Sequence, residues 1–315
     1  MQPVAVRALA FQAHPLALGE QSASIFPAAM YDLDTLTRRV PARPRTRFAP
    51  SPTGWLHLGH VVNAVWVWGA ARALNGRVIL RIEDHDRTRS RAEYEQGILE
   101  DLAWLGLEPD EYAGRQSDHD DRYAAALAQL DEAGLVYACR CSRRDIAETV
   151  PDVFNRETQY PGTCRALGLA REAGRGLRAR LARGTERFDD LVLGPQQQEP
   201  AAQCGDVLVR DRLGQWTYQF AVVVDDIADR VDLVIRGEDL LESTGRQISL
   251  ARLLGRDEPP VFAHHPLIVK PSGEKLSKAT GDTGIRELRA GGARPGDVLR
   301  DAAARSGLPR ELAPT

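Results

Sequence analysis

The spacing of apolar and polar residues predicts alternating strands and helices along most of the chain. Residues 46–50 form a short strand-like run, and residues 59–76 are apolar on nearly every turn and end at Asn75-Gly76, a good helix end. Residues 77–84 are a continuous apolar run closing in acids, typical of a buried strand. Strand, helix and strand within about forty residues predict a βαβ unit, and therefore a parallel sheet.

The same pattern continues toward the C-terminus. Two amphipathic helices are predicted over residues 90–105 and 118–133. Residues 206–226 predict a hairpin turn at Leu213-Gly214 followed by a strongly apolar strand. Further elements are a strand over residues 231–240, a helix over 241–255 and a last strand over 261–269. An α/β sheet is the simplest architecture for this order.

Two segments interrupt this order. Residues 139–204 are rich in Cys, Pro, Gly and Gln and are expected to form an inserted module. Residues 1–44 show little periodicity, so we expect a disordered or loosely attached extension, or an element that the pattern does not reveal; Met30 could be the true start. The expected divisions are residues 1–44, 45–138, 139–204, 205–268 and a loop with a short helical tail, 269–315.

Composition places few limits on function. The 315 residues are 43% apolar and 27% charged with a net charge of −3, so any nucleic-acid surface must be a local patch. The sequence has no apolar run of about 18 residues and no secretory signal pattern, so we expect no membrane span. Four cysteines, three of them clustered, favour a reducing cytoplasm and a metal site over disulfides.

The segment "RFAPSPTGWLHLGH", residues 47–60, carries the first candidate chemistry. It follows the first strand and begins the first helix, where ligands bind to α/β sheets and where backbone N–H groups attract anions. His57 and His60 are three residues apart and would share one helix face, from which both could contact phosphate oxygens. The alternative is that one or both are ordinary half-buried residues.

The segment "KPSGEKLSKATG", residues 270–281, follows the last apolar strand. Lys275 and Lys278 lie there in a Gly-flanked loop, and two flexible ammonium groups suit a pyrophosphate that must be held and then released. Alone this pattern is weak, because surface lysines are common. Paired with the histidine loop it predicts a phosphate site built from two distant segments.

The cysteines predict a structural zinc site. Cys139 and Cys141 form a Cys-x-Cys pair and Cys164 follows about two dozen residues later, which leaves a fourth position with no histidine nearby. Tyr160, four residues before Cys164, is the candidate for that position. The alternative is a set of free buried thiols. Cys204 lies apart and is expected to be structural.

"PTGWLHLGH" and "KLSKA" together resemble the two signature loops of class I aminoacyl-tRNA synthetases. The blocks "RIEDHD", "YQFAVVVDD" and "VIRGEDLL" resemble the glutamyl branch. The resemblance implies a Rossmann-like catalytic domain split by a zinc-containing insert. It also implies that the amino-acid carboxylate attacks the α-phosphorus of ATP, which is accompanied by Mg²⁺. The residues implied to bind ATP are His57, Gly59, His60, Lys275, Ser277 and Lys278. Of these, His57, His60, Lys275 and Lys278 are implied to be catalytic.

The same resemblance implies a glutamate site. Arg47 and Arg236 would bind the two carboxylates, Glu83 would accept the substrate ammonium, and Tyr218 and Ser51 would add polar contacts. Without the family context, surface ion pairs and core packing would explain these side chains equally well. The remaining residues of this predicted glutamate site are Phe48, Ala49 and Pro50.

Only residues 279–315 follow Lys278, which is too short for a folded anticodon-binding domain. This length, "EDLLESTGRQISL" and the Tyr-x₃-Cys spacing are similar to the glutamyl-Q tRNA(Asp) synthetases, a shortened branch. The resemblance implies transfer of L-glutamate to the queuosine base of tRNA(Asp), and we expect a monomer in the cytoplasm. The alternatives are a truncated glutamyl-tRNA synthetase that charges tRNA(Glu) and a silent zinc protein that binds nucleotide. Arginines over 171–187 predict either a phosphate-binding patch or a solvated helical face.

Overall fold

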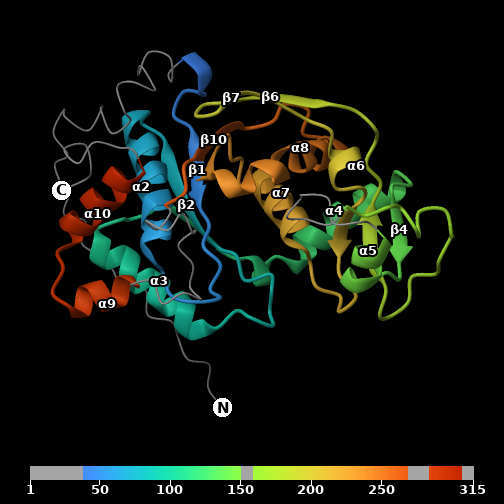
Figure 1. Cartoon of the computed structure of the whole chain (residues 1–315), viewed down its shortest axis with the longest axis horizontal. Coiled ribbons are helices and arrows are strands. Elements are labelled where there is room, and N and C mark those ends of the chain that lie inside the picture. The colour runs from blue at the N-terminus through green and yellow to red at the C-terminus, as the bar shows by residue number, and fades with distance from the viewer. Residues whose placement is uncertain (1–37, 150–158, 269–283, 307–315) are drawn as a thin grey trace.

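The computed structural model describes residues 38–149, 159–268 and 284–306 (Figure 1). Its first sheet has the order β1 (Arg45–Phe48), β2 (Arg77–Ile82), β3 (Glu111–Arg115), and both pairings are parallel. Helix α2 (Leu58–Ala73) connects β1 to β2, and α3 (Ala92–Leu105) connects β2 to β3. The predicted βαβ unit is therefore confirmed, with a second unit directly after it.

A second sheet continues the first. It has the order β7 (Gly194–Gln198), β6 (Glu186–Asp190), β10 (Val261–His265), β9 (Leu233–Gly237); β6, β10 and β9 are parallel, and β7 is antiparallel to β6. Strand β9 lies beside β1, because Asp232 N donates to Arg45 O at 3.0 Å and the Asp232 carboxylate accepts from Arg45 N at 2.7 Å. Parallel strands on both sides of this junction give an α/β fold with a parallel sheet, as predicted.

A third sheet lies at the other end of the molecule (Figure 1). Its strands are β4 (Val136–Cys139), β5 (Gly176–Ala179) and β8 (Val207–Arg210), and both pairings are antiparallel. The helices near it are α4 (Asp120–Glu132), α5 (Arg143–Thr149) and α6 (Pro200–Gln203). Strand pairing thus crosses both ends of the predicted insert: β5 pairs with β4 at its N-terminal end, and β5 and β6 pair with β8 and β10 beyond its C-terminal end. The division into modules stays a prediction.

Two elements differ from the prediction. The apolar run before Asp225-Asp226 is not a strand but helix α7 (Tyr218–Ala228), whose residues from Phe220 to Asp226 are all buried. A continuous apolar run suits a buried helix as well as a buried strand, so its pattern cannot separate the two. Residues 171–187 are likewise not a helical face, because β5 and the first residues of β6 lie within them.

The remaining helices close the fold. A 3₁₀ helix, Glu238–Ser243, leads into α8 (Thr244–Leu253), and α9 (Ile285–Ala290) and α10 (Pro295–Arg305) follow later in the chain. Helix α10 packs on α2 (Figure 1), which is why α2 is apolar almost all round: it is covered on its sheet side and on its outer side. Among the described residues, no helix combines the length and apolarity needed to cross a membrane.

Candidate active site

The loop between β1 and α2, residues 49–57, lies at the C-terminal end of the parallel sheet. Glu83 N donates to Pro50 O at 3.0 Å and Arg91 N donates to Pro52 O at 3.0 Å, so two backbone bonds tie the loop to the chain after β2. A cavity of about 280 Å³ opens beside it, lined by Phe48, Ala49, Pro50, Ser51, Thr53, His60 and Asn63. The predicted loop residues therefore border a space at the N-terminus of a sixteen-residue helix, where an anion is favoured.

His57 and His60 cap α2 reciprocally. Nδ1 of His57 accepts from Gly59 N at 3.1 Å, and His57 N donates to Nδ1 of His60 at 3.1 Å. The ring centroids lie 4.0 Å apart, which confirms that the two side chains share a face. Because both Nδ1 atoms accept hydrogen bonds, each neutral ring carries its hydrogen on Nε2, where it is a donor. A Cβ on Gly59 would lie 2.9 Å from Cε1 of His57, so the cap needs glycine there.

Arg47 is buried where β1 meets β9. Its Nε donates to both carboxylate oxygens of Asp226, at 3.2 and 3.3 Å, and its Nη1 donates to Ile235 O at 3.3 Å. These bonds hold the guanidinium in one orientation at the end of the sheet. Asp226 is therefore the anchor of the first predicted substrate cation.

Arg81 connects this pair to Glu83. Its side chain is fully buried, and its Nη2 donates to Asp226 at 2.9 Å and to Glu83 Oε1 at 3.1 Å. Burial alone would lower the pKa of Arg81, but the surrounding carboxylates outweigh burial and hold it well above its ordinary value. The other two carboxylates of this group are Asp225 and Asp229. Arg81 thus fixes Glu83 and Asp226 together beneath the site.

Arg236, at the end of β9, is the second predicted cation. Its Nη1 donates to Gln247 at 2.7 Å and its Nη2 to Thr244 Oγ1 at 2.7 Å. Its Nε donates to Nε2 of His264 at 3.0 Å. The three bonds come from α8 and β10, so elements packed around the sheet end orient this guanidinium.

His264 can accept from Arg236 because of Asp190. The Asp190 carboxylate lies 2.6 Å from Nδ1 of His264 and accepts its hydrogen, which leaves Nε2 as the acceptor. Burial lowers the pKa of His264, so the ring stays neutral and this tautomer persists at neutral pH. Asp190 belongs to β6, inside the predicted insert, yet it sets the geometry of a site on the main sheet.

Tyr218 is the first residue of α7 and completes the group. Burial raises the pKa of Tyr218, and the nearby charges of Arg236, Glu83 and Arg47 also act on its hydroxyl, which is therefore protonated at neutral pH. The structure thus places Arg47, Glu83, Tyr218 and Arg236 near one another at one end of the sheet, and their binding of glutamate stays a prediction. Lys275, Ser277 and Lys278 lie outside the described residues.

Four residues of this site were not predicted: Arg81, Asp190, Asp226 and His264. The paired aspartates that end the apolar run at 226 were a usable signal, because acids inside an apolar helix are rarely buried without cations. Asp190 had no local signal, since its partner His264 lies 74 residues away.

The predicted metal ligands also come together. The Sγ atoms of Cys139, Cys141 and Cys164 lie within 4.8 Å of one another, and those of Cys141 and Cys164 are 3.6 Å apart. Tetrahedral zinc with Zn–S bonds of about 2.3 Å needs sulfurs about 3.8 Å apart, so the thiols fit such an ion. The Tyr160 hydroxyl lies 3.5 Å from Cys139 Sγ and accepts from Cys164 N at 2.8 Å, which places an oxygen beside the thiols.

Comparison with known proteins agrees with this geometry. The family model of tRNA synthetases class I (E and Q), catalytic domain, matches residues 44–311. A Burkholderia cenocepacia protein named glutamyl-Q tRNA(Asp) synthetase is 45% identical over 269 residues, covering 84% of this chain and 88% of the relative. A protein of the same name from Symbiobacterium thermophilum is 43% identical over 296 residues, covering 85% of this chain and 90% of the relative.

A solved structure shares the fold. The glutamate tRNA ligase from Elizabethkingia meningosepticum, in complex with its amino acid, superposes with a TM-score of 0.70 at 30% identity and covers 83% of this chain. The present chain spans 60% of the length of that ligase. By the family model and by these relatives, the chain belongs to the glutamyl-Q tRNA(Asp) synthetase family of class I tRNA synthetases.

Proposed function

We propose that the protein activates L-glutamate with ATP and transfers it to the queuosine base of tRNA(Asp). The observation that carries this proposal is one continuous loop. Arg47, before it, belongs to a cluster with the charges of a glutamate site, and His57 and His60, at its end, cap a helix suited to phosphate. An amino acid and a nucleotide bound on the two sides of this loop would meet across it.

The charges suit glutamate. L-glutamate carries two carboxylates and one ammonium group, and the cluster offers two guanidinium groups and the Glu83 carboxylate. Arg47 and Arg236 are held by fixed partners, so binding does not have to order them. The protonated Tyr218 hydroxyl adds a donor for a carboxylate oxygen.

Activation then depends mainly on positioning and charge. The glutamate α-carboxylate attacks the α-phosphorus of ATP, a mixed anhydride forms and pyrophosphate leaves. The Nε2–H groups of His57 and His60 and the N–H groups that begin α2 would stabilise charge on the phosphate oxygens. Lys275 and Lys278 would hold the departing pyrophosphate, with Ser277 beside them and Mg²⁺ accompanying ATP.

Transfer completes the reaction. A hydroxyl of the acceptor base forms an ester with the activated carbonyl carbon, AMP leaves, and the hydroxyl proton passes to solvent. The names of the relatives support tRNA(Asp) as the acceptor. The likeness to a glutamate tRNA ligase favours a second candidate, the charging of tRNA(Glu).

Zinc would have a structural role. Cys139, Cys141, Cys164 and Tyr160 would hold the ion and would tie the end of β4 to residues 160–164. With all four positions taken by protein atoms, no position stays open for a substrate.

Two assays test the proposal. Glutamate-dependent exchange between ATP and pyrophosphate, measured without tRNA, should occur, and its absence would favour a silent nucleotide-binding protein. Labelled glutamate should then enter a purified pool of queuosine-containing tRNA(Asp). Label in tRNA(Glu) with none in tRNA(Asp) would contradict the proposal in favour of the second candidate.

A further inference from the structure

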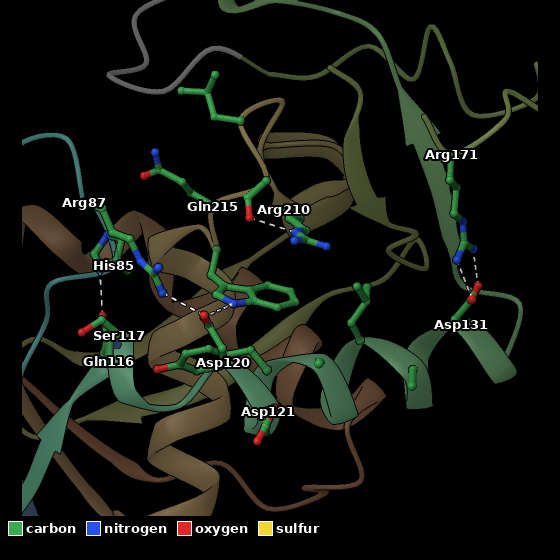
Figure 2. Close-up of a pocket in the computed structure, with 17 residues that line it drawn as sticks. His85, Arg87, Gln116, Ser117, Asp120, Asp121, Asp131, Arg171, Arg210 and Gln215 are labelled. Atoms are coloured by element: carbon green, nitrogen blue, oxygen red, sulfur yellow. Dashed lines mark hydrogen bonds and ion pairs between the residues drawn. The ribbon is translucent and has the colours of Figure 1, made fainter. Parts of the chain in front are cut away.

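A second and larger cavity lies beside the candidate active site. This groove has a volume of about 720 Å³ and lies between α4, residues 85–87 and the turn that follows β8 (Figure 2). Its walls carry Arg87, Asp120, Arg210 and Trp216. None of these residues takes part in the proposed binding of glutamate or ATP.

The groove adjoins the glutamate site. His85 lines the groove, and its ring centroid lies 5.9 Å from that of Tyr218. Nδ1 of His85 lies 2.8 Å from Gln116 Oε1, and Gln116 Nε2 donates to the buried Asp225 at 2.9 Å. Figure 2 shows His85 and Gln116 together on one side of the groove. One layer of side chains, formed by His85 and Gln116, therefore lies between the groove and the charged cluster beneath the glutamate site.

The groove contains a fixed aromatic platform. The ring of Trp216 stacks on Phe220 at 5.5 Å, and its Nε1 donates to Asp120 Oδ1 at 2.9 Å. A hydrogen bond at one edge and a buried ring behind it leave the indole a single orientation. Stacking on such a ring accepts any nucleobase, because every base has a π-face.

Cations and carboxylates alternate around this platform. The guanidinium of Arg210 lies over the Trp216 ring, 5.1 Å from its centroid, so a base that stacks there meets both side chains. Arg87, about half exposed, donates to Asp120 at 2.8 Å. Figure 2 shows Arg87 and Asp120 pointing toward each other across the groove. Arginines beside an aromatic ring suit the phosphates that flank an unstacked base. The carboxylates of Asp120 and Asp121 suit the secondary ammonium group of the queuosine side chain.

We propose that this groove binds the acceptor nucleotide of the tRNA, with its base on Trp216 and its flanking phosphates on Arg87 and Arg210. The proposal rests on the function proposed above, and it names the RNA-binding surface that this function needs. A base held there would lie next to His85 and Tyr218, with its side chain facing the activated glutamate.

The test separates transfer from activation. Trp216→Ala, Trp216→Phe, Arg87→Ala and Arg210→Ala would each be compared with the wild type by glutamate-dependent exchange without tRNA and by transfer to queuosine-containing tRNA(Asp). Arg305→Ala is the matched control, because Arg305 is a half-exposed arginine, paired with Asp301, on α10 at the other end of the molecule (Figure 1). Thermal unfolding of each variant would verify its fold.

Loss of stacking in Trp216→Ala should raise the KM for tRNA about 5- to 150-fold, while exchange is retained. Trp216→Phe should lose less, because a ring remains. Arg87→Ala and Arg210→Ala should each flatten the plot of log affinity for tRNA against log salt by about 0.7, the value for one single-strand phosphate contact.

Transfer that matches the wild type in all four groove variants would overturn the proposal. Exchange that falls in parallel with transfer would also overturn it, because the groove would then serve activation or folding. A failure of the proposed function can be told apart from a failure of the groove proposal, because the wild type itself would then leave tRNA(Asp) unlabelled. That result would also contradict the binding of queuosine in the groove.

Discussion

Replacing Asp190 by asparagine tests whether a buried histidine holds the second substrate cation in place. One oxygen of Asp190 accepts from Val192 N at 2.8 Å and Leu193 N at 2.9 Å, and the other accepts from His264 Nδ1 at 2.6 Å. In Asp190→Asn the amide oxygen can still accept from Val192 N and Leu193 N, while the amide NH₂ faces the ring of His264. The ring would then carry its hydrogen on Nε2, directly opposite the Nε–H of Arg236, which lies 3.0 Å away.

The size of the effect follows from the bonds that remain. A hydrogen bond to a charged group contributes about 1.5–3 kcal/mol, equivalent to about 10- to 150-fold in affinity. Gln247 and Thr244 still hold the two Nη groups of Arg236, so the lower part of that range applies. We expect the KM for glutamate in pyrophosphate exchange to rise about 10- to 30-fold, with the KM for ATP unchanged.

Exchange would be measured at varied glutamate and at varied ATP, together with thermal unfolding. Asp189→Asn is the matched control, because it makes the same substitution at the exposed neighbouring position on β6. A lower melting temperature with an unchanged KM for glutamate would exclude this role for Asp190, which would then support only the fold.

Three further predictions concern other parts of the molecule. Lys278→Ala should lower pyrophosphate exchange while glutamate binding, measured by equilibrium dialysis, is largely kept; equal loss of both would contradict its assigned role. Cys141→Ser should lower the zinc content below one ion per chain in atomic absorption, and a full complement would exclude this thiol as a ligand. Burial raises the pKa of Asp101 on α3 to about 6, and its Oδ2 has no hydrogen-bond partner among the described residues. The unfolded chain releases this proton near pH 4 and the folded chain near pH 6, so the charge lowers the free energy of unfolding by about 3 kcal/mol above pH 6. Asp101→Asn should therefore raise the melting temperature at pH 8 far more than at pH 4.5, and equal shifts would refute this.

The parts of the fold that were predictable from sequence are local. The βαβ unit over residues 45–82 was predictable from the apolar pattern and from the helix end at Asn75. Both signals lie within this one segment, so no distant contact is needed to read them. The shared face of His57 and His60 follows from their spacing of three. The approach of Cys164 to Cys139 and Cys141 follows from ligand chemistry, which predicts the grouping without knowledge of the fold.

The parts that were missed depend on distant contacts. In helix α7 the apolar residues run without a break from Phe220 to Val224, and such a run suits a buried strand as well as a buried helix. Arg81 pairs with Asp226, 145 residues away, and the sequence between them carries no sign of that pairing. The reciprocal cap of α2 also gives both histidines a structural role that spacing alone does not reveal.

The base that accepts glutamate can be identified directly. The protein would be incubated with glutamate, ATP, Mg²⁺ and queuosine-containing tRNA, and the tRNA would then be digested to nucleosides at mildly acidic pH for mass spectrometry. We predict that glutamate is found on queuosine, as an ester of its side chain. Glutamate found instead on the 3′-terminal adenosine, with unmodified queuosine, would contradict transfer to the anticodon base.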